Sequence, residues 1–329
     1  MTALRQLACQ LSVAAAQIQD VLVPFQHINH TADSGLNPVA RGGERAAETR
    51  IKLAVQLDQA RGGGRIHTKD YNGYNPAMLT PLQIEELSEQ FESQTPQEII
   101  LWAVDAFWPQ IALSSSFQTQ SVPLLHMVSQ IKRAMLIFFL DTGYHFWETA
   151  IFRERLASEW HLNVLDLYRD ARWDHFARRQ TRTLPLDDPN LCCFIHKVQP
   201  MQKAMKDMLA WISGIRRDQT AVRAKAKILE LQEDGLLKVN PLLNWTKADV
   251  KRYMEEHNLP SHPLLEKGYR SVGCAPCTVA IGVNDDERAG RWQGRGKIEC
   301  GLHTDMFKHK DVNELRSDFK INPVENNSR

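Results

Sequence analysis

Four of the six cysteines in this chain fall into two close pairs. Cys192 and Cys193 are adjacent, and Cys274 and Cys277 follow much later in the spelling CAPC. Four thiolates in two pairs suit a tetrahedral zinc ion or an iron–sulfur cluster, because both accept soft sulfur ligands. Adjacent cysteines are unusual in zinc sites, so the pattern favours an iron–sulfur cluster. Zinc and four unrelated buried thiols are the alternatives.

A further cysteine, Cys300, lies outside this set in the polar stretch IECGLHT. The neighbouring Glu299 does not activate it, but His303 and basic side chains from elsewhere could stabilise its thiolate, which is the reactive form of cysteine. A reactive thiol on a mobile tail could attack a substrate and then meet the thiol of a second protein. An incidental surface cysteine is the competing interpretation of this residue taken alone.

The stretch SSSFQTQS, residues 114–121, lies between a predicted strand and a predicted helix. Hydroxyl groups and free backbone amides at a helix N-terminus favour a bound anion. An ordinary turn that caps the helix is the alternative. The stretch is neither a G-x-x-x-x-G-K-[ST] loop nor a G-x-G-x-x-G loop.

Basic side chains could supply charge complementary to an anion. The arginines of GIRRDQTAVRA follow a predicted buried strand, where a charge needs an anion or a carboxylate as its partner. Surface ion pairs are the alternative for each of them. The candidates are Lys197, Arg216, Arg217, Arg223, Arg288 and Arg291.

Strand-like and helix-like segments alternate along the chain from about residue 80. Thr80 and Pro81 are typical of a helix start, and Thr246 caps a later predicted helix. The alternation predicts an α/β fold with a mainly parallel, doubly wound sheet. Ligands of such sheets lie beyond the carboxyl ends of the strands, where SSSFQTQS, DTGYH and GIRRDQ are expected.

Charge and composition narrow the class of protein. The 329 residues include 40 basic and 39 acidic side chains, for a net charge of +1, so nothing demands a nucleic-acid or membrane partner. No apolar run is long enough to span a bilayer, and the first residues do not read as a secretory signal. We expect a cytoplasmic protein, in which clustered thiols bind metal or do chemistry.

Three parts are predicted along the chain. Residues 1–79 form an extension that is partly helical, flexible and of unknown function. Residues 80–295 form the main domain with the four-cysteine site. Residues 296–329 form a mobile C-terminal tail that carries Cys300.

Taken together, these motifs resemble the assimilatory, thioredoxin-dependent adenylyl-sulfate and phosphoadenylyl-sulfate reductases. The resemblance covers roughly residues 85–305 and is specific in its cysteine motifs. The matching stretches are LSSSFQTQSVPLLH, DTGYHFWET, CCFIHKVQPM, WISGIRRDQTAVRA, the segment from PLLNWTKADV to VGCAPCT, ERAGRW and KIECGLH.

The resemblance implies an adenine-nucleotide α-hydrolase-like (PP-loop) fold and a set of site residues. Ser114, Ser115 and Ser116 would cradle the phosphosulfate of the substrate, with Phe117 and Gln118 lining the same turn. Many relatives have glycine where this chain has Gln118. Asp141, Thr142 and Gly143 would border the adenosine pocket, and the six basic side chains named above, with His303, would surround substrate and cluster.

It also implies a cofactor, a reaction and a partner. The paired cysteines would hold a [4Fe–4S] cluster, and Cys300 would attack adenylyl sulfate (APS) to form an S-sulfocysteine and release AMP. Thioredoxin or glutaredoxin would then free sulfite. Homo-oligomer formation stays open.

Three alternatives to this prediction remain. The main substrate could be the 3′-phosphorylated nucleotide (PAPS), since the SSSFQ spelling is closer to that of enzymes using it. An ATP-dependent PP-loop thiolase is more remote, because the turn lacks the glycines and aspartate of a pyrophosphate loop. A non-enzymatic, nucleotide-binding redox sensor would tolerate Cys300→Ser.

Overall fold

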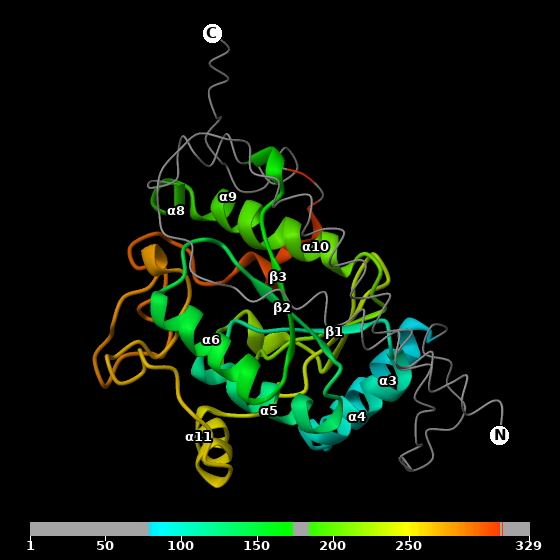
Figure 1. The fold of residues 1–329 in the computed structure, drawn as a ribbon. Coiled ribbons are helices and arrows are strands. Elements are labelled where there is room, and N and C mark those ends of the chain that lie inside the picture. The colour runs from blue at the N-terminus through cyan, green and yellow to red at the C-terminus, as the bar shows by residue number, and fades with distance from the viewer. Residues whose placement is uncertain (1–78, 174–183, 310, 312–329) are drawn as a thin grey trace, which may run out of the picture. The chain divides into compact units, whose positions relative to one another are not determined.

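The computed structural model describes residues 79–173, 184–309 and 311 (Figure 1). Apart from Leu79, the extension predicted for residues 1–79 lies outside the described residues, and so does the end of the predicted tail. No helix in the described ranges has the length and apolar character needed to cross a bilayer.

One six-stranded sheet organises the described chain, with the strand order β3-β2-β1-β4-β6-β5. All neighbouring strands run parallel except β5 and β6, which are antiparallel. The predicted α/β fold with a mainly parallel sheet is confirmed. The sequence analysis did not predict the short edge strand β5. The strands are β1 (Ile111–Ser114), β2 (Leu136–Leu140), β3 (Asn163–Leu167), β4 (Ala210–Ile212), β5 (Leu229–Leu231) and β6 (Leu237–Val239).

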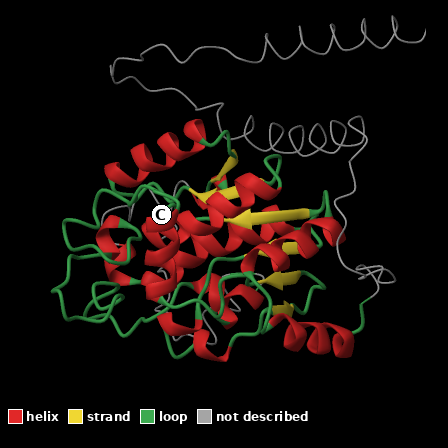
Figure 2. Cartoon of the chain, turned by 90° about the horizontal axis from the view of Figure 1, so that it is seen from below, coloured by secondary structure: helices red, strands yellow, loops and turns green. Residues whose placement is uncertain are grey.

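Helices cover both faces of this sheet (Figures 1 and 2). In Figure 1, α8, α9 and α10 lie on one side of the strands, and α4, α5 and α6 lie on the other. The helices are α3 (Pro81–Phe91), α4 (Pro96–Phe107), α5 (Val122–Ile131), α6 (Trp147–Glu159), α8 (Leu184–Asp187), α9 (Pro189–Cys193), α10 (Gln199–Met205) and α11 (Lys247–Glu256).

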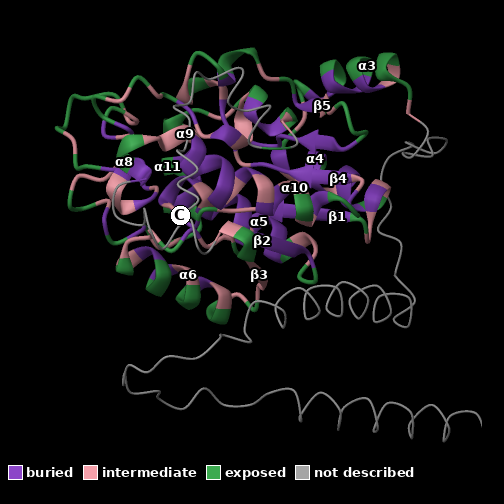
Figure 3. Ribbon diagram, turned by 90° about the horizontal axis from the view of Figure 1, so that it is seen from above, coloured by how far each residue is buried: buried purple, intermediate pink, exposed green. Residues whose placement is uncertain are grey.

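The strand side chains alternate between two apolar layers. Ile111 and Leu113 of β1 pack with α4, α5 and α11, whereas Ala112 packs with α9 and α10 on the other face. In β4, Trp211 alone faces the second layer and is fully buried. The central strands β1, β2, β4 and β6 are mostly buried, as Figure 3 shows, which is typical of parallel sheets, whereas β3 at the edge is intermediate throughout.

The predicted helix starts are confirmed by their hydrogen bonds. Thr80 Oγ1 accepts from the Gln83 amide at 3.3 Å, and the Gln83 side chain accepts from the Thr80 amide at 2.9 Å. Thr246 and Asp249 form the same reciprocal pair at the start of α11. Such capping boxes satisfy amides that have no partner within the helix.

The sheet order reverses between β1 and β4, and this reversal positions the site. In the sheet, β1 and β4 are neighbours, with β2 on the outer side of β1 and β6 on the outer side of β4. The connections therefore diverge at the carboxyl ends of β1 and β4 and leave a crevice there. Ser114 ends β1, and Ser213 directly follows β4.

Candidate active site

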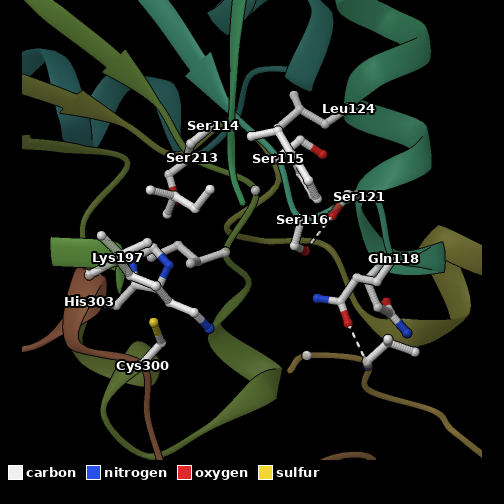
Figure 4. Close-up of a pocket in the computed structure, with 18 of the residues that line it drawn as sticks. Ser114, Ser115, Ser116, Gln118, Ser121, Leu124, Lys197, Ser213, Cys300 and His303 are labelled. Carbon is white, nitrogen blue, oxygen red and sulfur yellow. Dashed lines mark hydrogen bonds between the residues drawn. The ribbon is translucent and has the colours of Figure 1, made fainter. Parts of the chain in front are cut away.

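A pocket of about 1090 Å³, which includes its open mouth, occupies this crevice. Figure 4 shows Cys300, His303 and Lys197 on one side and the serine turn on the other. The pocket joins residues from the first strand to the last described segment. The predicted site residues that line it are Ser114, Ser115, Ser116, Gln118, Lys197, Arg223, Arg288, Arg291, Cys300 and His303.

The serine turn is held by its own hydroxyl groups. Ser114 Oγ accepts from Trp211 Nε1 at 2.8 Å, and Ser115 Oγ accepts from the Phe117 amide at 3.1 Å. The hydroxyls of Ser116 and Ser121 lie 3.4 Å apart. No side chain caps α5 at Ser121. The Val122 amide donates to the Thr119 carbonyl group, and Pro123 has no N–H, so the first two residues of α5 offer no free amide. Anion binding at this turn therefore stays a prediction, which the hydroxyl groups support.

Phe117 is a correction to the prediction. Its side chain is fully buried and meets the Phe139 ring edge to face at 5.7 Å, so it belongs to the core and does not line the pocket. The left-handed backbone of the turn also falls at Phe117, with φ of 51°. Gln118 has φ of −81°, so a side chain there is unstrained, and its Oε1 accepts from the Val272 amide at 3.0 Å.

The segment that carries Cys300 is packed onto the domain. Met306 and Phe307 are buried in the second apolar layer, and the Phe307 ring lies 5.3 Å from the Trp211 ring. Gln202 of α10 donates a hydrogen bond to the Phe307 carbonyl group. Packing thus continues past the predicted boundary at residue 295, and this structure shows a docked position of the tail. Its mobility stays a prediction.

Cys300 is half-buried as a residue, lines the pocket and lies in a field that favours its thiolate. A hydrogen bond with Cys193 and the charge of Lys197 hold the pKa of Cys300 well below its ordinary value, despite burial. Burial alone would lower the pKa of Lys197, but nearby Cys274, Cys300 and Cys193 raise it. Lys197 is therefore a cation at neutral pH, as a nucleophilic thiolate requires.

His303 lies beside the nucleophile but is not a cation. Its ring stacks on Trp211 with 5.9 Å between ring centroids and an interplanar angle of 14°. Burial and the nearby Arg223 hold the pKa of His303 well below its ordinary value, so the ring is neutral at pH 7. A neutral ring could stabilise the thiolate only as a hydrogen-bond donor, and the expected role of His303 stays a prediction. Its Nδ1 is buried without a hydrogen-bond partner among the described residues.

Two predicted arginines lie outside the pocket wall. Arg216 is fully buried, where Nε donates to Asp218 at 2.9 Å and Nη1 donates to the Gln120 side chain. Arg217 forms a two-pronged ion pair with Glu92, the residue directly after α3, at 2.6 and 2.8 Å. The structure thus favours the surface ion-pair alternative for Arg217, whereas Arg216 forms its ion pair in the interior. Arg216 orients Gln120, which does line the pocket.

The DTG turn also departs from its predicted place. Thr142 is buried, and its Oγ1 lies 3.3 Å from Cys274 Sγ, on the side of the paired cysteines. Asp141 Oδ1 accepts from the Gly143 amide at 3.0 Å and closes the turn on itself. None of these three residues lines the substrate pocket. Their predicted border with an adenosine is thus not seen.

The four paired cysteines line one smaller cavity. Cys192 and Cys193 end α9, where the helix passes into a π-helical turn (Phe194–Val198). Cys274 directly precedes a 3-10 turn (Ala275–Cys277), and Cys277 ends it. All four are buried free thiols. No three Cys, His, Asp or Glu side chains of the described chain are placed to hold a single metal ion.

Two buried polar atoms beside the cysteines lack partners. Trp292 Nε1 and His196 Nε2 make no hydrogen bond within the described residues, although both side chains line the cysteine cavity. An unpaired buried donor is costly. Four thiols and an unpaired indole N–H therefore fit a ligand that binds thiolates and also accepts hydrogen bonds, as the sulfides of an iron–sulfur cluster do.

Several site residues were missed by sequence reasoning. Ser213 and His145, which line the substrate pocket, are two of them. Lys197, Cys274 and Arg291 were predicted as site residues, but their place on the walls of both cavities was not. The glycine at position 273 could have indicated a close backbone contact, because a Cβ there would collide with the Arg291 guanidinium. The glycine before CAPC thus lets Arg291 approach the backbone closely.

The fold and the pocket place a cysteine among hydroxyl groups and basic side chains at the carboxyl edge of a mainly parallel α/β sheet. The family model described as the phosphoadenosine phosphosulfate reductase domain matches residues 110–280. The adenosine 5′-phosphosulfate reductase of Salinibacter ruber is 37% identical over 224 residues, which are 68% of this chain and 89% of that protein. The protein of that name from Streptomyces coelicolor is 37% identical over 67% of this chain and 92% of its own. The chain therefore belongs to this family, which confirms the resemblance.

A solved structure agrees with the family. The phosphoadenylyl-sulfate reductase of Candida auris, solved as a phosphate complex, has a TM-score of 0.54 and 29% identity to this chain. The match covers 61% of this chain and 98% of that one. The fold that the sequence predicted is thus that of a sulfonucleotide reductase.

Proposed function

We propose that this protein reduces adenylyl sulfate to sulfite and AMP in sulfate assimilation. The observation that carries this proposal is that Cys300 shares one pocket with the serine turn and with the basic side chains Lys197, Arg223, Arg288 and Arg291. The relatives from Salinibacter and Streptomyces, which are named for the unphosphorylated nucleotide, support this choice of substrate.

The first half of the reaction is a thiol displacement. The Cys300 thiolate attacks the substrate sulfur, a new S–S bond forms, and the S–O bond to the AMP phosphate breaks with its electron pair on the phosphate oxygen. AMP is a stable anionic leaving group and needs no general acid. Positive side chains that face the developing charge lower the barrier in such a pocket. Burial and Arg223 lower the pKa of Arg288 only to about 10, so Arg288 is a cation at neutral pH.

The second half requires a thiol protein, for which we propose thioredoxin or glutaredoxin. One thiolate of the partner attacks Cys300 Sγ and expels sulfite, and the partner's second thiol resolves the mixed disulfide. Cys300 is partly exposed, as this exchange requires, and Ile298 two residues earlier is 63% exposed.

We further propose that Cys192, Cys193, Cys274 and Cys277 hold a [4Fe–4S] cluster. The support is the shared cavity of four free thiols, their lack of a single-ion arrangement and the unpaired Trp292 indole beside them. When bound, the cluster would supply a delocalised negative charge. The chain's own contribution is to hold Lys197 and Arg291 between these thiols and the substrate pocket.

Metal analysis tests the cluster separately from activity. Anaerobically purified protein should contain about four iron and four sulfide per chain. Cys277→Ser should lose both, whereas Cys300→Ser should keep both, because Cys300 is not among the proposed ligands. Stoichiometric zinc without sulfide would overturn the cluster proposal.

Sulfite release tests the function. We would compare kcat/KM for adenylyl sulfate and its 3′-phosphorylated form, with reduced thioredoxin under anaerobic conditions. We expect at least a tenfold preference for adenylyl sulfate, about 1.4 kcal/mol of differential transition-state binding. The reverse preference would transfer the assignment to the phosphorylated nucleotide, for which the Candida auris relative is named. No sulfite from either would overturn the reductase proposal.

A further inference from the structure

A buried carboxylate lies directly before the nucleophile and takes no part in the chemistry above. The Glu299 side chain is only 2% exposed. A buried carboxylate is costly unless charges and hydrogen bonds compensate it. Burial alone would raise the pKa of Glu299, but Arg223 and Arg288 hold it at about 2. Glu299 is therefore an anion throughout the physiological pH range.

The partners of Glu299 come from two distant parts of the chain. Arg223 donates Nε and Nη2 to the two carboxylate oxygens, both at 2.7 Å, and Arg288 Nη2 donates at 3.2 Å. The Thr220 hydroxyl donates a further bond at 3.2 Å. Two-pronged arginine–carboxylate pairs fix orientation as well as distance. Glu299 thus fastens the last described segment to the arginines of the pocket.

The same carboxylate holds the backbone of the nucleophile. The Cys300 amide donates to Glu299 Oε1 at 2.8 Å. On the other side of Cys300, Gly301 packs so closely that an added Cβ would collide with Met306 and Val198. Cys300 therefore lies between an ionic anchor at Glu299 and an apolar anchor at Met306 and Phe307.

Glu299 leaves part of the arginine hydrogen-bonding capacity unused. Arg288 Nη2 donates hydrogen bonds to Glu299 and to the Ile298 carbonyl group. Arg288 Nε is buried and has no hydrogen-bond partner within the described chain. Both Arg223 and Arg288 line the pocket. A substrate anion could therefore bind Arg288 while Glu299 keeps its own bonds, so the two anions need not exclude each other.

We propose that Glu299 is a positioning residue that docks Cys300 over the pocket by clamping Arg223 and Arg288. This inference rests on the proposed function for its kinetic consequence, but the docking itself does not require that function. Without the clamp, the segment would keep its apolar anchor and the Gln202 hydrogen bonds farther along the chain, and Cys300 would sample positions away from the pocket.

Alkylation of Cys300 by iodoacetamide, followed by peptide mass spectrometry, tests the docking without any nucleotide. The holoprotein, Glu299→Gln and Glu299→Asp would be measured anaerobically as a function of pH. Removal of the Glu299 charge shifts the pH midpoint and also makes the thiolate less nucleophilic, so a changed field alone cannot raise the plateau rate at high pH. Undocking raises that plateau, because the thiolate is fully formed there and its accessibility limits the rate. We expect Glu299→Gln to raise that plateau at least fivefold and Glu299→Asp to raise it less.

Glu92→Gln is the matched control, because Glu92 forms a two-pronged pair with Arg217 away from the pocket. It should leave the Cys300 plateau unchanged. In sulfite assays, Glu299→Gln should lower kcat at least tenfold with KM changed less than threefold, and Glu299→Asp should recover part of kcat.

The outcomes separate the two proposals. A wild-type plateau in Glu299→Gln overturns the clamp, whether or not sulfite is made. A raised plateau in a protein that makes no sulfite from either nucleotide supports the clamp and overturns the reductase function. If Glu299→Gln does not fold, the folded Glu299→Asp variant decides, and a wild-type plateau in that variant overturns the clamp.

Discussion

The substrate pocket and the cysteine cavity share a wall but differ in what lines them. Hydroxyl groups and arginines surround the substrate pocket, whereas buried thiols and prolines surround the cysteine cavity. Lys197, Cys274 and Arg291 belong to both. A charge on a shared wall acts on both sides through a low-dielectric interior. The comparison indicates that Lys197 couples the electrostatics of the two sites.

The largest expected effect belongs to the substrate pocket alone. Cys300→Ser should lower sulfite release at least a thousandfold, about 4 kcal/mol of barrier, because a hydroxyl group is not ionised at neutral pH. The affinity for AMP, measured by calorimetry, should stay within threefold. Substantial sulfite release by this variant would point to a different nucleophile and contradict the assignment of Cys300 as the nucleophile of the substrate pocket.

The second largest expected effect is a pH-dependent loss of stability caused by His262, next to the serine turn. His262 is buried, its amide donates to Thr119 Oγ1, and its ring is hydrogen-bonded to Thr149. Burial lowers the pKa of His262 to about 4, so the fold favours the neutral ring. Its stabilisation is present above pH 6.5, the ordinary pKa, and is lost as pH falls from 6.5 to 4, by up to about 3 kcal/mol.

Urea unfolding at several pH values measures this loss. The free energy of unfolding of the wild type, minus that of His262→Asn, should fall by up to about 3 kcal/mol between pH 7.5 and pH 4. The iron content, measured over the same pH range, shows whether loss of the proposed cluster from the cysteine cavity contributes to the change. A difference that stays constant with pH would mean that His262 is not held neutral by the fold.

The shared wall itself is tested by Lys197→Ala. Loss of this cation should lower kcat about a hundredfold, or about 2.7 kcal/mol, and should also shift the visible and paramagnetic resonance spectra of the cluster while iron content is retained. Lys132→Ala, at the C-terminal end of α5, is the control and should change neither. Unchanged turnover and unchanged spectra in Lys197→Ala would refute the coupling.

The smallest effect should be confined to the cysteine side. Thr142→Val removes the hydroxyl group that lies 3.3 Å from Cys274 Sγ and costs about 1 kcal/mol locally. We expect the cluster absorbance to bleach severalfold faster in air, with turnover in anaerobic assays within twofold of wild type. Ser129→Ala, far from both cavities, is the control. A tenfold loss of anaerobic turnover would show that Thr142 serves the substrate pocket after all.

Local sequence patterns predict most of the architecture. The caps at Thr80 and Thr246 and the alternation of apolar strands with amphipathic helices depend on residues close together in the chain, so the sequence alone indicates both. The serine turn and Cys300 also stand out, because their residue types have few ordinary structural uses. The three-residue strand β5 does not, because so short a segment carries no clear period.

The arginines show what sequence analysis could not predict, namely which charged side chain lines the pocket. Arg216, Arg217 and Arg223 occur in one short stretch, yet only Arg223 lines the pocket. The partners of Arg217 and Arg223, which are Glu92 and Glu299, lie far away in sequence, whereas Arg216 pairs with Asp218 two residues on. Sequence reasoning sees the charge but not the carboxylate that neutralises it, so it could not separate an anion ligand from a structural ion pair.

By itself, the sequence determined the α/β class, the family, the paired thiols and the identity of the candidate nucleophile, because each depends on residue types and local spacing. Only the tertiary structure decided that Phe117 is a core residue, that His303 is neutral and that the Cys300 segment is docked by Glu299. Each of these depends on burial and on partners brought together by folding. Burial sets the cost of a charge, and no single segment of the chain contains that information.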